Sequence, residues 1–335
     1  MAERNSDETA GPSHPRTDVQ NMDILVVASV LRDSTEGSSV EEMSRDSQPA
    51  LDNEKTTSGA DNTLRRPADS KLLLEAHIRD IWEQLCVDLV DRKVWKVDKF
   101  DTLTSLDAYS EDVRHYPVED DRIRMKKRRH AALRLRSNPE RWSRIALNAM
   151  RELATDSSGP AVANLVQSGF LAAFKDFAVH TRYFQLTKNL MESAGITVFV
   201  AGHASSSIHD IDKLDPIMLA GYSERWEDRK DTALWHACLE SHYSLNTHHQ
   251  QNELWHLEDS DDKERHCWKA LPELLCDKSS RSLQKELNGV VSPKMWTVQT
   301  QFYLGMPELW LERVTWMAAQ LAERTPSGEP NVTVT

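Results

Sequence analysis

Apolar residues at helical spacing are the feature that most constrains the fold of this chain. After Lys71 they recur on one helix face, at Leu74, Ile78, Ile81, Trp82, Leu85 and Leu89. The same spacing returns after Arg141, after Asp231 and after Pro307. Residues three or four positions apart share one face of an α-helix, and such faces are buried against one another in helical bundles. Ile196–Val200 is one isolated, β-branched, strand-like run, so the sequence predicts an all-α fold.

Composition along the chain predicts four parts. Residues 1–70 are rich in Ser, Thr, Asp, Glu, Gly and Pro and contain no aromatic residue. Such a segment buries too little apolar surface to offset chain entropy, so we expect a disordered N-terminal region. Residues 71–158 form a helical extension, residues 161–323 form the main helical domain, and residues 324–335 form a flexible tail.

Glycine and proline predict where individual helices end. One helix is expected from about Ala161 to Ala194, followed by Gly195 at its C-terminal end. Pro272 falls inside a later helical pattern, so that helix is either kinked or begins anew there. The last helix is expected to start at Pro307, because proline is tolerated in a first turn.

Net charge and cysteine usage exclude several classes of function. The formal net charge is −12, which argues against a general nucleic-acid-coating or membrane-surface role. No run of 18 apolar residues is present, so we expect no membrane span. The four cysteines show no CxxC spacing, and Met1–Arg4 lacks the apolar core of a signal peptide. We therefore expect an intracellular protein, either cytoplasmic or nuclear.

Residues 122–136 form one strongly basic block in this acidic chain. A nuclear-import or nucleic-acid-binding patch is one interpretation of the block. The favoured interpretation is a solvated helix face, balanced by Glu119, Asp120 and Asp121. Nucleic acid is therefore retained only as a weak candidate partner.

Histidines and acidic residues gather between residues 180 and 277. His209 and Asp210 are adjacent and supply one imidazole nitrogen and one carboxylate, a pair suited to a divalent metal. His180 and His242 each share a helix face with apolar residues and are expected to point inward, whereas His236 lies on another face. The other candidates lie later in the chain or close to the doublet: Lys213, His248, His249, Glu273 and Asp277.

In chain order these residues resemble the HD-domain metal phosphohydrolases. These are all-α enzymes in which a helix His, an HD doublet and a later helix Asp bind one metal, and further histidines hold a second metal in many members. His209-Asp210-Ile211-Asp212-Lys213 looks like their HD-x-x-K segment, and His180 and Asp277 match the first His and the last Asp. His242 with His248 or His249 matches the intervening set.

A closer resemblance is to an uncharacterised HD-like family of small domains found largely in phages and bacteria. That family has HD-x-S-K, then a run like HH-x-x-x-N-P-HH, then a segment like E-M-x-x-D-W. The corresponding segments here are 209–213, 241–249 and 273–278, and the similarity covers roughly residues 170–320. The chain departs from the pattern at four positions: Asp212 for Ser, Ser241 for His, Thr247 for Pro and Lys278 for Trp.

The resemblance implies an HD-like helical bundle that hydrolyses a phosphorylated small molecule or a nucleotide. Its implied metal ligands are the side chains of His180, His209, Asp210, His242, His248 and Asp277. The implied cofactor is a divalent metal (Mn, Fe, Co, Ni, Zn or Mg) that activates water for attack on phosphorus. Lys213 would then contact the phosphate, His249 would protonate the leaving group or hold the phosphate, and Glu273 would orient a ligating imidazole.

Other classes of protein remain open from the sequence. The main alternative is a non-catalytic interaction or regulatory protein on a degenerate HD-like scaffold, with the long N-terminal region as its working part. A ββα-metal nuclease needs paired strands around its histidines, whereas residues 235–244 have a helical pattern. A structural zinc site is disfavoured because the chain has no cysteine pair.

Overall fold

The computed structural model describes residues 81–325, except residues 115, 156–157 and 202. All regular secondary structure among these residues is helical, which confirms the all-α prediction. Every described residue belongs to one compact unit, Asn62–Thr335. The disorder predicted for residues 1–70 falls on residues outside the described part. So does most of the flexible tail predicted at 324–335. None of the described helices is both long and apolar enough to cross a membrane.

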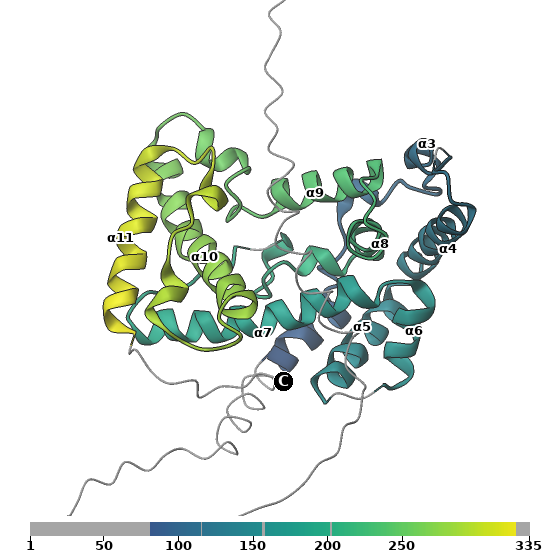
Figure 1. The fold of residues 1–335 in the computed structure, drawn as a ribbon, viewed down its shortest axis with the longest axis horizontal. Coiled ribbons are helices and arrows are strands. Elements are labelled where there is room, and N and C mark those ends of the chain that lie inside the picture. Colours follow the sequence, from purple (N-terminus) through teal and green to yellow (C-terminus); the bar gives the residue numbers. More distant parts are fainter. Residues whose placement is uncertain (1–80, 115, 156–157, 202, 326–335) are drawn as a thin grey trace, which may run out of the picture. The chain divides into compact units, whose positions relative to one another are not determined.

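Nine α-helices among the described residues carry most of the fold (Figure 1): α3 (Glu111–Arg114), α4 (Glu119–Arg136), α5 (Pro139–Ala154), α6 (Pro160–Ser168), α7 (Leu171–Ser193), α8 (Pro216–Trp226), α9 (Ala233–Leu245), α10 (Asp261–Lys285) and α11 (Glu308–Arg324). Short helical turns connect them: η2 (Cys86–Asp91), η3 (Asp98–Phe100), η4 (Asp107–Tyr109), η5 (His203–Ser205), η6 (Ile211–Leu214), η7 (Glu253–His256), η8 (Pro293–Trp296) and η9 (Thr300–Tyr303).

Side-chain caps start several of these helices. Asp215 accepts a hydrogen bond from the Ile217 amide at the start of α8, and Thr232 does the same for Trp235 at the start of α9. Ser260 caps α10 in the same way, through the amide of Lys263. Each cap satisfies a backbone donor that the first helical turn leaves without a partner.

Two predicted elements differ from the structure. The helix expected over 161–194 is broken into α6 and α7 by Gly169, whose φ of 71° is left-handed and favours glycine. The Gly169 carbonyl accepts a hydrogen bond from Arg128 Nε at 2.9 Å, which holds this break against α4. Ile196–Val200 forms no strand but an irregular segment, since no described strand is present to pair with it. At Pro272 the helix continues, and α10 runs through it.

Two hydrophobic cores lie along α7, which packs against α8 near one end and against α10 near the other (Figure 1). The first core takes Phe174 and Phe177 from α7 and joins them to α4, α5, α6, α8 and α9. The second takes Tyr183 and Phe184 from α7 and joins them to α10 and α11. His180 lies between these two pairs on α7. The first core includes residues from both sides of the domain boundary expected near residue 160, and the boundary itself stays a prediction.

The basic block of α4 forms the solvated face that we favoured from the sequence only in part. Arg128, Arg129 and Arg136 are buried, at 2%, 5% and 8% exposure. Their guanidinium groups pair with carboxylates of α8 and its flanking residues, namely Glu224, Glu227, Asp228 and Asp215. The sequence did not indicate this pairing because the partners lie about 80 to 100 residues away. Other basic residues of α4 are exposed, and nucleic-acid binding by them stays a prediction.

Candidate metal centre

Helices and turns from both cores bring the predicted site residues to one place. α7 supplies His180 from its middle, α9 supplies His242 from its last turn, and α10 supplies Asp277 and, four residues before it, the orienting Glu273. The other ligands lie immediately before η6 and in the turn after α9. None of these residues is more than 6% exposed: His180, His209, Asp210, His242, His248, His249, Glu273 and Asp277.

The His209–Asp210 doublet is fixed by the first core. Asp210 has a left-handed φ of 58°, a conformation that aspartate adopts more readily than most residues. Just beyond it, the Leu214 carbonyl accepts a hydrogen bond from Trp142 Nε1 at 2.8 Å. Asp215 pairs with Arg136 at 2.8 Å. The turn that carries the doublet is thus anchored to α4 and α5, far from it in the sequence.

The first set of ligands, the α7–α10 group, consists of His180, His209 and Asp277. Their ligand atoms lie within 4.8 Å of one another. Asp277 Oδ1 is 3.0 Å from His180 Nε2 and 3.5 Å from His209 Nε2. Asp210 Oδ2 lies 3.4 Å from His209 Nε2 and borders the same group.

The second set of ligands, the α9 group, consists of Asp210, His242 and His249. Their ligand atoms also lie within 4.8 Å of one another. His242 Nε2 lies 3.6 Å from Asp210 Oδ1 and 2.8 Å from His249 Nε2. His248 Nε2 is 3.4 Å from the same carboxylate oxygen. The two oxygens of Asp210 therefore face different imidazoles, which is the arrangement of a carboxylate that bridges two ions.

Several of these ligand atoms are buried without a well-aligned hydrogen bond, although ionisable partners lie 3.0 to 3.4 Å away. They are His180 Nε2, His209 Nε2, His248 Nε2, His248 Nδ1 and Asp210 Oδ1. Leaving a buried polar atom unpaired costs about 1–3 kcal/mol, so a cluster of such atoms at one point calls for an explanation. Imidazole and carboxylate are the ligands of mid-sized divalent metals, and a bound ion would satisfy these atoms. The residues present therefore fit a divalent metal.

Two buried carboxylates orient the imidazoles from behind. Glu273 Oε1 lies 2.9 Å from His209 Nδ1, and Asp212 Oδ2 lies 2.7 Å from His242 Nδ1. Because Nδ1 of each ring is engaged, Nε2 is left to face the cluster. This carboxylate–imidazole arrangement is typical of histidines that bind metals. Asn246 adds hydrogen bonds to Asp212 Oδ1 at 3.1 Å and to the His242 carbonyl at 2.9 Å.

Asp212 and Asn246 are site residues that the sequence did not identify. Asp212 was noted only as a departure from a family pattern. Asn246 follows His242 by four residues and therefore lies on the same side of α9, which was the available signal. His236, expected outside the site, is 41% exposed in its side chain and pairs with Asp231.

Replacing an orienting carboxylate is expected to weaken metal binding without removing a ligand. We expect Glu273→Ala and Asp212→Ala each to lower metal affinity about 10- to 100-fold, because His209 or His242 would lose its fixed ring orientation. Titration with Mn²⁺ or Zn²⁺, followed by calorimetry, measures the change. Glu312→Ala, which removes an exposed carboxylate from α11, is the matched control. Equal affinities in all four proteins would contradict the orienting role.

Two of the imidazoles are held neutral by their surroundings. Burial and the charge of Arg281 lower the pKa of His180 to about 3. Burial and the neighbouring His248 and His242 hold the pKa of His249 well below its usual range. Neutral imidazole is the form that binds a metal ion.

In two other imidazoles the neighbouring carboxylates raise the pKa and so favour the protonated form. Burial alone would lower the pKa of His248, but the charges of Glu273 and Asp210 outweigh it and raise this pKa to about 10. Burial also opposes protonation of His209, yet the charge of Asp210 leaves its pKa raised. A metal ion must therefore displace a proton from His248.

Metal binding at pH 7 is expected to release protons, and metal affinity is expected to fall as the pH is lowered. The reason is that His248 is protonated at pH 7 in the ion-free protein and must become neutral to bind. Protonated His248 stabilises the ion-free fold fully below pH 6.5, and this contribution is lost as the pH rises through about 10. Calorimetry in two buffers of different ionisation enthalpy measures the released protons. The same binding enthalpy in both buffers would contradict the prediction, and His248→Gln is expected to release fewer protons.

The sequence also raised a ββα-metal nuclease site and a structural zinc site with cysteine ligands. The described residues form neither of these two sites. The residue groups with metal-site spacing contain no cysteine there, and His242 lies on a helix and not between paired strands.

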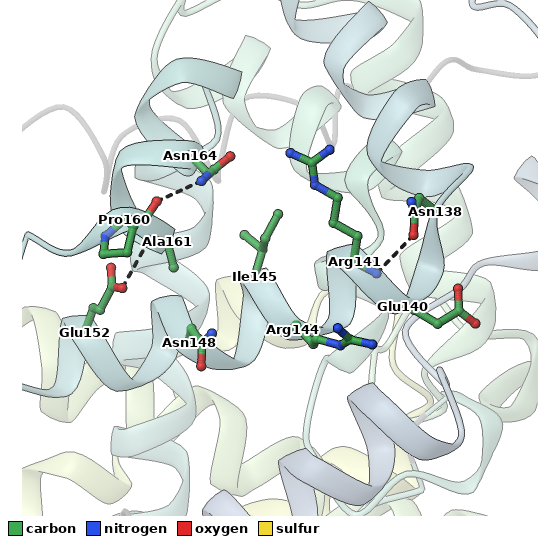
Figure 2. Close-up of a pocket in the computed structure, with 10 residues that line it drawn as sticks. All are labelled: Asn138, Glu140, Arg141, Arg144, Ile145, Asn148, Glu152, Pro160, Ala161 and Asn164. Atoms are coloured by element: carbon green, nitrogen blue, oxygen red, sulfur yellow. Dashed lines mark hydrogen bonds between the residues drawn. The ribbon is translucent and has the colours of Figure 1, made fainter.

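A pocket of about 450 Å³ lies between α5 and α6, but its lining residues do not include any ligand of the candidate centre (Figure 2). Its Glu152 accepts hydrogen bonds from the Ala161 and Val162 amides, at 3.1 and 2.7 Å, and so caps α6 (Figure 2 shows the Ala161 contact).

Comparison of the chain with protein-family models, with curated proteins and with solved structures found no match. The resemblance to HD-domain phosphohydrolases therefore depends on the residues and their order. Their spatial arrangement, with both oxygens of Asp210 facing imidazoles, is a separate observation made on this chain alone.

Proposed function

We propose that this chain is a metal-dependent phosphohydrolase of the HD type, which cleaves phosphomonoesters or phosphodiesters, with nucleotides among its candidate substrates. The observation that carries the proposal is the position of Asp210. Its Oδ1 faces His242 and His248, and its Oδ2 faces His209. One carboxylate shared by two groups of imidazoles is suited to two ions that act on one phosphate.

The α7–α10 group would hold one ion and the α9 group the other, with Asp210 between them. The donor set is rich in imidazole, which favours Mn, Fe, Co, Ni or Zn over Mg. His249 belongs to the α9 group and lies 2.8 Å from His242 Nε2, so we assign it to the metal and not to the leaving group. Glu273 contacts His209, His248 and the Ala201 amide, so we assign it a positioning role.

Bound divalent ions would supply an activated water and would compensate charge on the phosphate. Lys213 would bind a phosphate oxygen and offset the negative charge that develops during cleavage. Its side chain is 12% exposed, and its ammonium lies 2.8 Å from Asp210 Oδ2. The Tyr222 ring lies 5.4 Å from this ammonium and helps to hold it at the edge of the site.

A non-catalytic interaction protein on the same scaffold is the second candidate. It is favoured by the ion pairs of Lys213 and Lys278, which already neutralise Asp210 and Asp277 without any ion. In that case the cluster is a buried polar network that specifies the packing of α7 against α10. Metal content separates the two candidates.

The decisive experiment measures metal and hydrolysis on the same preparation. The full chain, purified without chelator, is analysed for bound metal. It is then loaded with Mn²⁺, Co²⁺ or Ni²⁺ and assayed against nucleotides, p-nitrophenyl phosphate and bis-p-nitrophenyl phosphate. We expect bound metal and hydrolysis in the wild type and neither in Asp210→Ala. A metal-free wild type, or equal rates in the two proteins, would overturn the proposal.

A further inference from the structure

A second lysine, Lys278, lies beside the candidate metal centre. Lys278 Nζ lies 3.1 Å from Asp277 Oδ2, whereas His180 and His209 lie nearest to Asp277 Oδ1. Its side chain is 22% exposed, whereas the Asp277 side chain is only 7% exposed. Lys278 therefore reaches from solvent to a ligand of the α7–α10 group, as Lys213 reaches to Asp210.

The carboxylates of the two ion pairs both lie close to one imidazole nitrogen. His209 Nε2 is 3.4 Å from Asp210 Oδ2, which Lys213 contacts, and 3.5 Å from Asp277 Oδ1, on the carboxylate that Lys278 contacts. The two ammonium groups thus border the same cluster from two different carboxylates. Both side chains are partly exposed, so both can meet a solute that enters the cluster from solvent.

The charges of the cluster depend on what occupies it. Its four buried carboxylates are Asp210, Asp212, Glu273 and Asp277. Two divalent ions would balance these four charges, and the carboxylate oxygens that the ammonium groups now contact would be drawn to the ions. Lys213 and Lys278 would then carry two positive charges without partners inside the cluster. Such charges favour an anionic ligand, and their separate positions favour a ligand with two anionic groups.

We infer that Lys213 and Lys278 form a two-point anion site, which selects substrates with two adjacent phosphate groups, as in nucleoside diphosphates and triphosphates. Lys213 holds the phosphate at the metal ions, and Lys278 holds the neighbouring phosphate. This inference rests on the proposed function, since loading with metal is what frees the two lysines. Lys278 is then the residue that distinguishes a diphosphate from a monophosphate.

Binding of non-hydrolysable ligands tests the inference without an activity assay. The probes are methylenediphosphonate, which has two adjacent anionic groups, and methylphosphonate, which has one. Both are titrated into the metal-loaded full chain at a fixed free Mn²⁺ concentration. We expect the diphosphonate to bind about tenfold or more tightly, and Lys278→Met to remove most of this preference, since one charge-assisted hydrogen bond is lost. Methylphosphonate affinity is expected to stay unchanged in Lys278→Met.

Two further variants separate this effect from general loss of charge or structure. Lys269→Met removes an exposed lysine from the same helix and is expected to keep the preference. Lys278→Arg is expected to keep part of it, because the positive charge remains. In the absence of any anion, Lys278→Met is expected to bind Mn²⁺ more tightly than the wild type, because Asp277 loses a competing ammonium. A purely structural lysine would not change metal and diphosphonate affinity in opposite directions.

The outcomes also distinguish failure of this inference from failure of the proposed function. A protein that binds no metal and cleaves no phosphate ester overturns both. A protein that binds metal and cleaves phosphate esters, but binds the two phosphonates equally, overturns only the two-point site. An unchanged preference in Lys278→Met also overturns it.

Discussion

Asp210→Ala is expected to abolish metal binding completely, whereas His180→Gln is expected to leave one of two ions bound. The side chain of Asp210 borders both groups of imidazoles through separate oxygens, at 3.4 Å from His209 Nε2 and 3.6 Å from His242 Nε2. His180 contacts only the α7–α10 group, through Asp277. Its loss therefore leaves the α9 group intact.

Metal analysis of dialysed protein, after loading with excess Mn²⁺ or Zn²⁺, measures this stoichiometry. We expect about two ions per chain in the wild type, about one in His180→Gln, and none in Asp210→Ala. His249→Gln is expected to lose the other ion. The double variant His180→Gln/His249→Gln is therefore expected to bind no ion, like Asp210→Ala. Circular dichroism establishes that each variant is folded. Full metal content in Asp210→Ala would show that the ions bind elsewhere.

Arg129→Met is expected to destabilise the fold by about 3–5 kcal/mol, the cost of leaving a buried charge without its partner. Arg129 forms two parallel hydrogen bonds with Glu224, at 2.7 and 2.9 Å. Glu224 is fully buried and also accepts a hydrogen bond from Thr232 Oγ1 at 2.6 Å. Without Arg129 this carboxylate would have to be buried uncompensated or take up a proton.

Urea denaturation of the ion-free protein measures the free energy of unfolding. The double variant Arg129→Met with Glu224→Leu is expected to regain most of the stability, because neither charge is then left unpaired. Arg134→Met, which removes an exposed arginine from the same helix, is expected to change stability by less than about 0.5 kcal/mol. If Arg129→Met and Arg134→Met had the same effect, the pairing with Glu224 would contribute nothing to the fold.

Much of the site was predictable because helical spacing fixes which side of a helix each residue occupies. His180 follows Phe177 by three residues and His242 follows Cys238 by four, so both imidazoles were expected among buried side chains. They are 1% and 2% exposed. His236, one residue from Trp235, was expected on another side and is exposed. These are properties of a single helix, and the local sequence is sufficient for them.

Other features depended on partners that lie far away in the sequence. Asp212 became a site residue only because α9 places His242 Nδ1 2.7 Å from it, although 30 residues separate the two. The arginines of α4 had the composition of a solvated face, yet α8 offers them buried carboxylates. The irregular path of Ile196–Val200 leads to the Ala201 amide, which donates a hydrogen bond to Glu273 Oε2 at 2.9 Å.

The sequence by itself determined the all-α class, the inward direction of His180 and His242, and most of the candidate metal ligands. Periodicity and residue chemistry are local, so no knowledge of packing was needed for them. Only the tertiary structure decided that α7 joins two cores, that α10 brings Glu273 to His209 across 64 residues, and that both oxygens of Asp210 face imidazoles. The physical reason is that these contacts arise from the packing of helices against one another, and the spacing of residues along one helix carries no record of its partners.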